Sequence, residues 1–121
     1  MKDVNYQIAD ITTAENYIWG ETCSGWHFVK NNELSVIRES MPPRTKEKIH
    51  LHKYAQQFFY ILNGTATFEI EGEVVSIRQG QGIHINKGKR HRILNKGHDS
   101  LKFLVISQPK SHGDRVEFSN S

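Results

Sequence analysis

The dipeptide Asn63-Gly64 separates two stretches of strand-like sequence, and no other feature restricts the fold of this chain as strongly. Residues 57–62 run into it, and residues 65–71 follow with apolar Ala66, Phe68 and Ile70 alternating with polar neighbours. Asn-Gly favours a two-residue turn between antiparallel strands, because both central residues of a type I′ turn need positive φ. The pattern predicts a hairpin with one buried face and one wet face.

From residue 26 onward, the rest of the chain also has the sequence pattern of short strands. We expect short strands over residues 26–30, 33–41, 45–52, 73–78, 83–86, 90–95 and 101–107, with glycines marking several of the breaks. One short helical turn is expected over residues 13–19, capped by Thr13. Several short strands at close spacing, without a long helical period, are typical of an all-β sandwich or barrel.

Composition restricts the class of protein and its partners. The chain has 121 residues, of which 36% are hydrophobic and 24% charged, as expected of one globular domain. Its formal charge of +3 favours anionic ligands but is too small to indicate a nucleic-acid partner. Cys23 is the only cysteine, which suits a reducing compartment. The N-terminus lacks the apolar region of a signal peptide and no apolar run is long enough for a membrane helix, so we expect a cytoplasmic protein without a membrane partner.

The His50-Leu51-His52 tripeptide is the first candidate for a functional site. On a strand, the side-chain period of two places both imidazoles on one face and Leu51 on the other. If that face is the interior of a barrel, the pair makes half of a transition-metal site. If it is the outside of an edge strand, these are two surface histidines. The tripeptide alone leaves both interpretations open.

Two spaced motifs resemble those of the cupin superfamily. The first runs from Arg44 through the His50-Leu51-His52 tripeptide to Gln57 and Gly64, and the second runs from Gly80 through 86-Asn-Lys-Gly-88 to His91 and Asn95. The internal spacing matches the family pattern throughout, and the resemblance covers roughly residues 24 to 109. Three positions depart from it. Arg44 stands for the first glycine, Asn86 for a proline, and Gln57 for the glutamate that usually binds metal.

The resemblance implies a fold and a ligand set. The fold is a cupin-type double-stranded β-helix, or jelly-roll barrel, with a short irregular N-terminal segment. The expected organisation is a single domain of residues 1–121, with a barrel core at about 24–109, an N-terminal arm at 1–23 and a C-terminal tail at 110–121. The implied metal ligands are His50, His52, His91 and Gln57, with Gln56 as the fallback under a shorter spacing. The ion would be a divalent transition metal, namely Fe, Ni, Zn, Cu, Co or Mn, since nitrogen-rich ligation suits these ions.

A glutamine at position 57 changes the expected electrostatics of such a site. Three neutral imidazoles and one amide leave the full charge of the ion uncompensated, which favours an acidic bound water and an anionic ligand. With ordinary imidazoles, the metal should dissociate as the pH falls below about 6.

Strand parity suggests which residues contact the ligand. Lys48 shares the expected inward face of His50 and can hold an anionic group, unless it lies past the barrel mouth and is only solvated. Phe59 and Ile61 share the inward face of Gln57 and provide an apolar lining. Away from this site, His27 and His84 are expected to point outward, and Asp114 is expected to pair locally with Arg115.

The resemblance allows several functions. Three-histidine cupins often activate oxygen, so the first hypothesis is a metal-dependent oxygenase or related oxidoreductase that acts on a small anionic molecule. No general base can be identified from the sequence, so the catalytic residues stay unknown. The alternatives are a sugar isomerase or epimerase, which needs a proton-transferring side chain in the cavity, and a non-enzymatic sugar- or acid-binding module. Exposed sheet edges and the apolar residues of the N-terminal arm favour a homodimer.

Overall fold

The computed structural model describes residues 5–111 and 113–119, and strands joined by turns account for its secondary structure. None of the described residues forms a helix of the length and apolar character needed to cross a membrane. The expectation of an all-β fold is confirmed. In chain order the strands are β1 (Glu15–Trp19), β2 (Cys23–Lys30), β3 (Ser35–Met41), β4 (Thr45–Lys46), β5 (His50–His52), β6 (Gln56–Asn63), β7 (Thr65–Ile70), β8 (Glu73–Arg78), β9 (Gly82–Ile85), β10 (His91–Asn95), β11 (Leu101–Gln108) and β12 (Arg115–Glu117).

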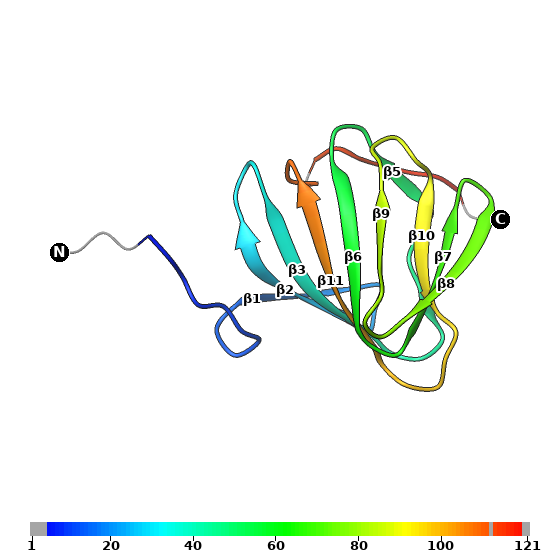
Figure 1. The fold of residues 1–121 in the computed structure, drawn as a ribbon, viewed down its shortest axis with the longest axis horizontal. Helices are drawn as coiled ribbons and strands as arrows, with labels where there is room; N and C mark the ends of the chain where they lie inside the picture. The colour runs from blue at the N-terminus through cyan, green and yellow to red at the C-terminus, as the bar shows by residue number, and fades with distance from the viewer. Residues whose placement is uncertain (1–4, 112, 120–121) are drawn as a thin grey trace.

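Two sheets face each other and enclose the core (Figure 1). The first has the strand order β1-β2-β3-β11-β6-β9, and the second has the order β12-β5-β10-β7-β8, with β4 pairing beside β5 on β10. The neighbouring strands pair antiparallel throughout. Successive strands therefore often lie in opposite sheets, and side chains from distant parts of the sequence meet between them.

The hairpin predicted at Asn63-Gly64 is wrong. Strand β6 pairs with β11 and β9 in the first sheet, whereas β7 pairs with β10 and β8 in the second. The chain crosses from one sheet to the other at Gly64, whose φ of 90° is available to glycine at no steric cost. The two-residue hairpin turn lies one strand later, at Glu71-Gly72, where both residues have positive φ and Ile70 pairs with Glu73.

Three other segments differ from their predicted form. The helical turn predicted over residues 13–19 is instead strand β1, which pairs with β2. The single strand predicted over residues 45–52 is broken between β4 and β5, so the parity argument that linked Lys48 to His50 does not apply. Residues 115–117 of the predicted tail form β12 on β5, although the sequence there lacks an apolar alternation.

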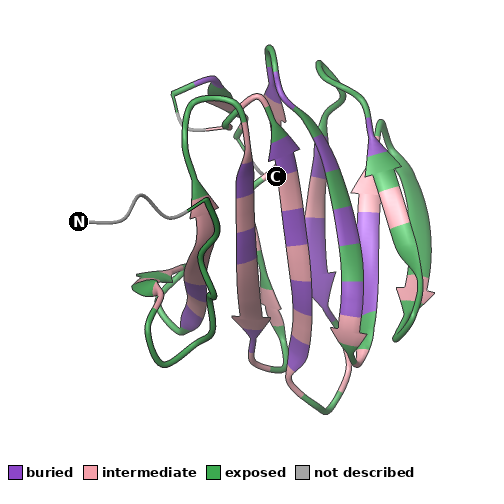
Figure 2. Ribbon diagram, turned by 60° about the vertical axis from the view of Figure 1, so that its left-hand side comes forward, coloured by how far each residue is buried: buried purple, intermediate pink, exposed green. Residues whose placement is uncertain are grey.

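The core lies between the sheets and determines which faces are buried. Its fully buried large side chains are Phe68, Phe103, Met41, Ile61, Ile93 and Leu101. Figure 2 shows the resulting alternation of buried and more exposed residues along β6 and β11. On β6 this alternation buries Gln57, Phe59 and Ile61 and exposes the residues between them, as the period of two requires.

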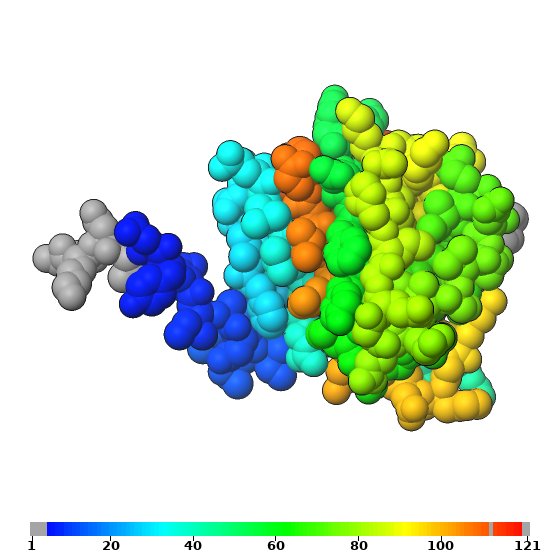
Figure 3. Space-filling view, viewed as in Figure 1, coloured from blue at the N-terminus to red at the C-terminus, as the bar shows by residue number. Residues whose placement is uncertain are grey.

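The N-terminal arm projects from this body. Residues 5–14 extend away from the sheets and form the dark blue projection in the space-filling view (Figure 3). Tyr6 is 76% exposed and Ile8 is 87% exposed, so the arm presents apolar side chains to solvent. Such exposure is typical of a segment that packs on another molecule.

Candidate metal centre

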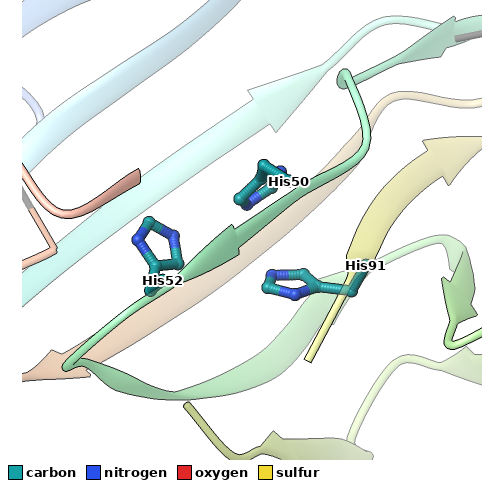
Figure 4. Close-up of side chains that lie close together, drawn as sticks. All are labelled: His50, His52 and His91. Atoms are coloured by element: carbon teal, nitrogen blue, oxygen red, sulfur yellow. The ribbon is translucent and has the colours of Figure 1, made fainter. Parts of the chain in front are cut away.

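Three buried histidines gather between the sheets (Figure 4). His50 and His52 come from the same face of β5, and His91 begins β10 directly opposite His50 in the strand register. Their exposed fractions are 2%, 5% and 2%, so the interpretation as surface histidines is wrong. One ring nitrogen from each lies within 4.8 Å of the other two. The sequence motif therefore produces a compact set of three imidazoles in the interior.

Each imidazole is held through its Nδ1 atom. The Nδ1–H group of His50 donates to the carbonyl of Lys48 at 2.8 Å, and that of His91 donates to the carbonyl of Lys89 at 2.8 Å. His52 donates from Nδ1 to Asp114 Oδ1 at 2.7 Å. Since a neutral imidazole carries one N–H, these bonds leave every Nε2 atom with a free lone pair. This is the tautomer that a metal ligand requires.

Gln57 reaches the same place from the opposite sheet. Its side-chain Nε2 donates to Ser107 Oγ at 3.0 Å, which directs Oε1 to within 3.2 Å of His91 Nε2. Both of these atoms are acceptors in the tautomer described above, so they repel each other unless a cation lies nearby. Two adjacent ligands of one transition-metal ion lie about 3.0–3.4 Å apart when each bond is about 2.1 Å. The observed separation fits two donors that share one ion.

The electrostatic environment keeps the imidazoles neutral. Burial, followed by the charges of Arg115 and His91, lowers the pKa of His50 to about 3. Burial likewise lowers the pKa of His91 to about 4 and lowers that of His52. The folded chain thus resists protonation at the pH of about 6 at which ordinary imidazoles begin to lose metal. A cation that accepts three neutral nitrogens and an amide oxygen suits this set better than a proton does.

Asp114 supports the centre from the C-terminal segment, a role that the sequence did not indicate. Its Oδ1 accepts from His52, and its Oδ2 accepts from the backbone N–H groups of Tyr54 and Ala55 at 3.0 and 2.9 Å. Burial alone would raise the pKa of Asp114, but these hydrogen bonds hold it below its ordinary value. The predicted ion pair with Arg115 is wrong, because the carboxylate faces His52 instead. Carboxylate–histidine pairs of this kind orient metal ligands.

An open cavity of about 870 Å³ adjoins the histidines. His50, His52 and Gln57 line it, together with the proposed ligand contacts Lys48 and Phe59. Lys48 is exposed and lies just before β5, whereas Ile61 is fully buried in the core and is not among the lining residues. The cavity is large enough for a molecule of ordinary metabolite size.

The same cavity has a polar wall that the sequence did not reveal. Tyr17, His27, Glu39, Glu47 and Arg115 line it, and each lies outside the two motifs or between the residues that define them. The prediction that His27 points outward is wrong, since it packs against the Tyr17 ring with 4.9 Å between the ring centroids. Tyr17 lies on strand β1, which was predicted as a helical turn, so its place in this wall could not be predicted either.

Comparison with known proteins identifies relatives that match more than half of the chain. The family model for the cupin domain matches residues 37–107, which is more than half of the chain. An uncharacterized protein of Methanocaldococcus jannaschii is 30% identical over 86 residues, covering 70% of this chain and 69% of that protein. The oxalate-binding protein of Thermotoga maritima is 32% identical over 76 residues, covering 63% of each chain.

Solved structures show the same fold. A predicted oxalate decarboxylase of Thermotoga maritima superposes with a TM-score of 0.77 at 21% identity, covering 86% of this chain and all of that one. The polyketide cyclase RemF of Streptomyces resistomycificus superposes with a TM-score of 0.81 at 15% identity, covering 96% of this chain and 87% of that one. At these identities the likeness supports the double-stranded β-helix fold and no particular reaction.

Proposed function

The chain belongs to the cupin family, and from this premise we propose that it is a metal-dependent cupin that binds a small anionic molecule in its cavity. The proposed ligands of a divalent transition metal are His50, His52 and His91, with Gln57 as the fourth. The observation that carries the proposal is the cluster of three buried, neutral imidazoles, one of which, His91, lies 3.2 Å from the Gln57 amide oxygen. The ion would be Fe, Ni, Zn, Cu, Co or Mn, since all of these accept imidazole nitrogen.

The donor set explains the preference for an anionic partner. When bound, a divalent ion would supply a Lewis acid whose charge the four neutral ligands leave uncompensated. The exposed Lys46 and Lys48 line the cavity, but five glutamates line it too, so the side chains alone do not favour an anion. A carboxylate or phosphate would be attracted chiefly by the uncompensated charge of the ion, with the two lysines as a further source of positive charge. The related oxalate-binding protein makes a small carboxylate the first ligand to test.

The apolar lining limits what else the ligand carries. Phe59 lies beside Gln57 on the inward face of β6 and lines the cavity, so it would pack against the carbon skeleton of the ligand. Ile61 does not line the cavity and would act indirectly, through the core cluster that it shares with Phe59. Lys48 would hold an anionic group at the exposed rim. These three roles are proposals for separate substitution.

The proposed reaction is oxidation of the small acid by a metal-dependent oxygenase or a related oxidoreductase. A second candidate is isomerisation of a sugar derivative, because Tyr17 and Glu39 provide side chains that can transfer a proton in the same cavity. An oxygenase consumes oxygen and an isomerase does not, so oxygen uptake distinguishes these two reactions. An oxygen-electrode screen of the metal-loaded chain with small carboxylic and sugar acids separates them. Non-enzymatic binding would give saturable affinity with neither oxygen uptake nor product.

Ligand binding itself is tested by calorimetry. Oxalate titrated into the metal-loaded chain should bind with saturable heat, and the His91→Ala variant, which loses one proposed ligand, should show neither metal nor oxalate binding. Lys89→Ala is the matched control, because His91 receives only the backbone carbonyl of Lys89. Oxalate binding that persists in His91→Ala would contradict the proposed site.

We further propose a cytoplasmic homodimer in which the N-terminal arm packs on the second subunit. The exposed Tyr6 and Ile8 support this assembly, because apolar side chains on a projecting arm gain most from burial against a partner. Sedimentation velocity should give a dimer for the full chain and a shift toward monomer for the double variant Tyr6→Ser, Ile8→Ser. A full chain that sediments as a monomer at high concentration would contradict the dimer.

A further inference from the structure

The wall of the cavity away from the histidines is built around a contact between Tyr17 and Glu39. The Tyr17 hydroxyl donates to Glu39 Oε2 at 2.7 Å. In the strand register Tyr17 pairs with Gly25, and Gly25 pairs with Glu39, so the tyrosine ring crosses the middle strand to reach the carboxyl group. A Cβ atom on Gly25 would lie 2.3 Å from Tyr17 Cζ, which only glycine avoids. The sequence of β2 therefore makes room for this contact.

Glu39 keeps one oxygen available to the cavity. Tyr17 occupies Oε2, and among residues 5–111 and 113–119 no hydrogen bond is made to Oε1. Glu39 lines the cavity, and Oε1 is not among the buried atoms that lack a partner. This carboxylate oxygen is therefore free to accept a hydrogen bond from a ligand in the cavity.

The register separates this wall from the metal centre by an apolar band. Gln57 pairs with Ser107 in one row of the first sheet, and Phe59, Val105 and Ile37 form the next inward-facing row. Glu39 lies one inward-facing row further along β3, so about 13 Å of strand separate it from the Gln57 row. The three residues of the apolar row line the cavity. A ligand that touches both ends must be elongated and apolar in the middle.

We propose that Glu39 forms a recognition site for a hydroxyl group on the end of the ligand opposite its metal-binding carboxylate. A hydroxyl group can donate to Glu39 Oε1, which Tyr17 leaves unoccupied. Tyr17 is the positioning residue, because it fixes the Glu39 carboxyl group. This inference rests on the proposed function and defines its ligand as an elongated hydroxylated carboxylic acid.

The charged groups around Glu39 support this role. Tyr17, Glu47 and Arg115 face it, and His27 contacts it indirectly through the Tyr17 ring. Burial raises the pKa of Glu39 to about 7, although the Tyr17 hydrogen bond and the Arg115 charge oppose the rise. The carboxyl group therefore takes both protonation states near neutral pH, and its ionised form is the stronger acceptor.

The test compares two acids that differ in one hydroxyl group, 4-hydroxycinnamate and cinnamate. Calorimetry on the zinc-loaded chain should give about tenfold tighter binding of 4-hydroxycinnamate. Glu39→Leu removes the acceptor and should abolish this preference, so that the two acids bind with equal affinity. Glu47→Gln is the matched control, because Glu47 lines the same cavity but uses Oε1 to accept from the Ile93 N–H and lies 3.8 Å from Arg115 through Oε2. It should keep the preference.

A second measurement tests the inference without Glu39→Leu, in case that variant does not fold. In the wild-type chain the preference for 4-hydroxycinnamate should increase between pH 6 and pH 8 as Glu39 ionises, and in Glu39→Gln it should stay constant. Equal affinities for the two acids in the wild-type chain, or a preference that persists in Glu39→Leu, would overturn the inference. If both acids bind only in the presence of zinc but equally well, the recognition site fails and the metal centre stands. If neither acid responds to zinc, the proposed function fails first.

Discussion

His91 and Gln57 come from opposite sheets, and the distance between His91 Nε2 and Gln57 Oε1 is 3.2 Å with lone pairs on both atoms. Hydrogen bonds hold both groups in place, since Ser107 on the neighbouring strand accepts from the amide of Gln57 and the nearby Lys89 carbonyl accepts from the Nδ1–H of His91. The repulsion between the two acceptors is therefore built into the fold, and a cation shared by both atoms would relieve it. The proposed three-histidine, one-glutamine centre is the basis of the predictions below.

Replacing Gln57 by glutamate should strengthen metal binding and weaken binding of an anionic ligand. The added charge offsets part of the charge of the ion, so metal affinity should rise by about ten- to a hundredfold. The affinity of the metal-loaded variant for oxalate should fall, because less uncompensated charge remains. A chelator competition assay measures the first effect and calorimetry the second. Gln56→Glu, on the exposed face of β6, is the control and should change neither. Unchanged metal affinity in Gln57→Ala would show that Gln57 is not a ligand.

Replacing Asp114 by asparagine should lower metal affinity through His52. An amide accepts more weakly than a carboxylate from the Nδ1–H of His52 and can offer an N–H₂ group in its place, so the ring is held less firmly in the ligand tautomer. Loss of such a partner typically lowers metal affinity by about ten- to a hundredfold. The same chelator competition measures the change. Asp99→Asn, at an exposed turn, should leave the affinity at its wild-type value. Equal losses in the two variants would argue against a specific role for Asp114.

Acid should release the metal at a lower pH than ordinary imidazoles would. The pKa values of His50 and His91 are lowered from 6.5 to about 3 and about 4, so protons compete with metal only as the pH approaches that range. Bound zinc should therefore remain on the folded chain at pH 5. Equilibrium dialysis across pH 4 to 7 measures the release, and a midpoint near 6 would contradict the burial argument.

The lowered pKa values of His50 and His91 also determine how the stability of the metal-free chain responds to acid. The unfolded histidines take up protons below about pH 6.5, whereas the folded ones do not until about pH 4. The contribution of these groups to stability is therefore complete above pH 6.5 and is lost as the pH falls toward 4. Compared with the wild-type chain, a variant with His91→Gln should lose less stability over this interval. Urea unfolding at pH 7 and pH 5 tests this, and equal losses would contradict it.

The sequence predicted the cluster of three histidines better than it predicted the path of the chain. The histidines are marked by two local motifs, and burial of alternate residues is sufficient to turn such motifs inward. The Asn63-Gly64 turn was misassigned because a positive φ serves a sheet crossing as well as a hairpin, and only the pairing partners distinguish the two. Those partners lie far away in the chain, on β11 and β10.

The polar wall and the support for His52 were hidden for a different reason. Asp114 lies 62 residues from His52 and stands in a polar stretch, where no alternation marks it as buried. Tyr17 and Glu39 meet only because β1, β2 and β3 pair in one register across Gly25. Contacts of this kind depend on the tertiary structure, and no spacing within the sequence encodes them.

Replacing Gly25 by alanine should destabilise the fold and disturb the cavity wall. The new methyl group would lie 2.3 Å from Tyr17 Cζ and 2.5 Å from its hydroxyl oxygen, so the ring must move away from Glu39. We expect a loss of about 1–3 kcal/mol in the free energy of unfolding, measured by urea titration. Gly97→Ala is the control, since its nearest contact would be Asn95 Oδ1 at 3.4 Å. If the two variants lost equal stability, the packing of Tyr17 on Gly25 would not be the cause.

The proposed function depends most directly on whether this chain holds a metal ion at the three histidines. The decisive measurement is elemental analysis of protein purified without chelator and without a histidine tag, before and after reconstitution, for the wild-type chain and for His91→Ala. We predict about one equivalent of a divalent transition metal in the wild-type chain and a large loss in the variant. A wild-type chain that contains no transition metal and takes up none on reconstitution would contradict the account.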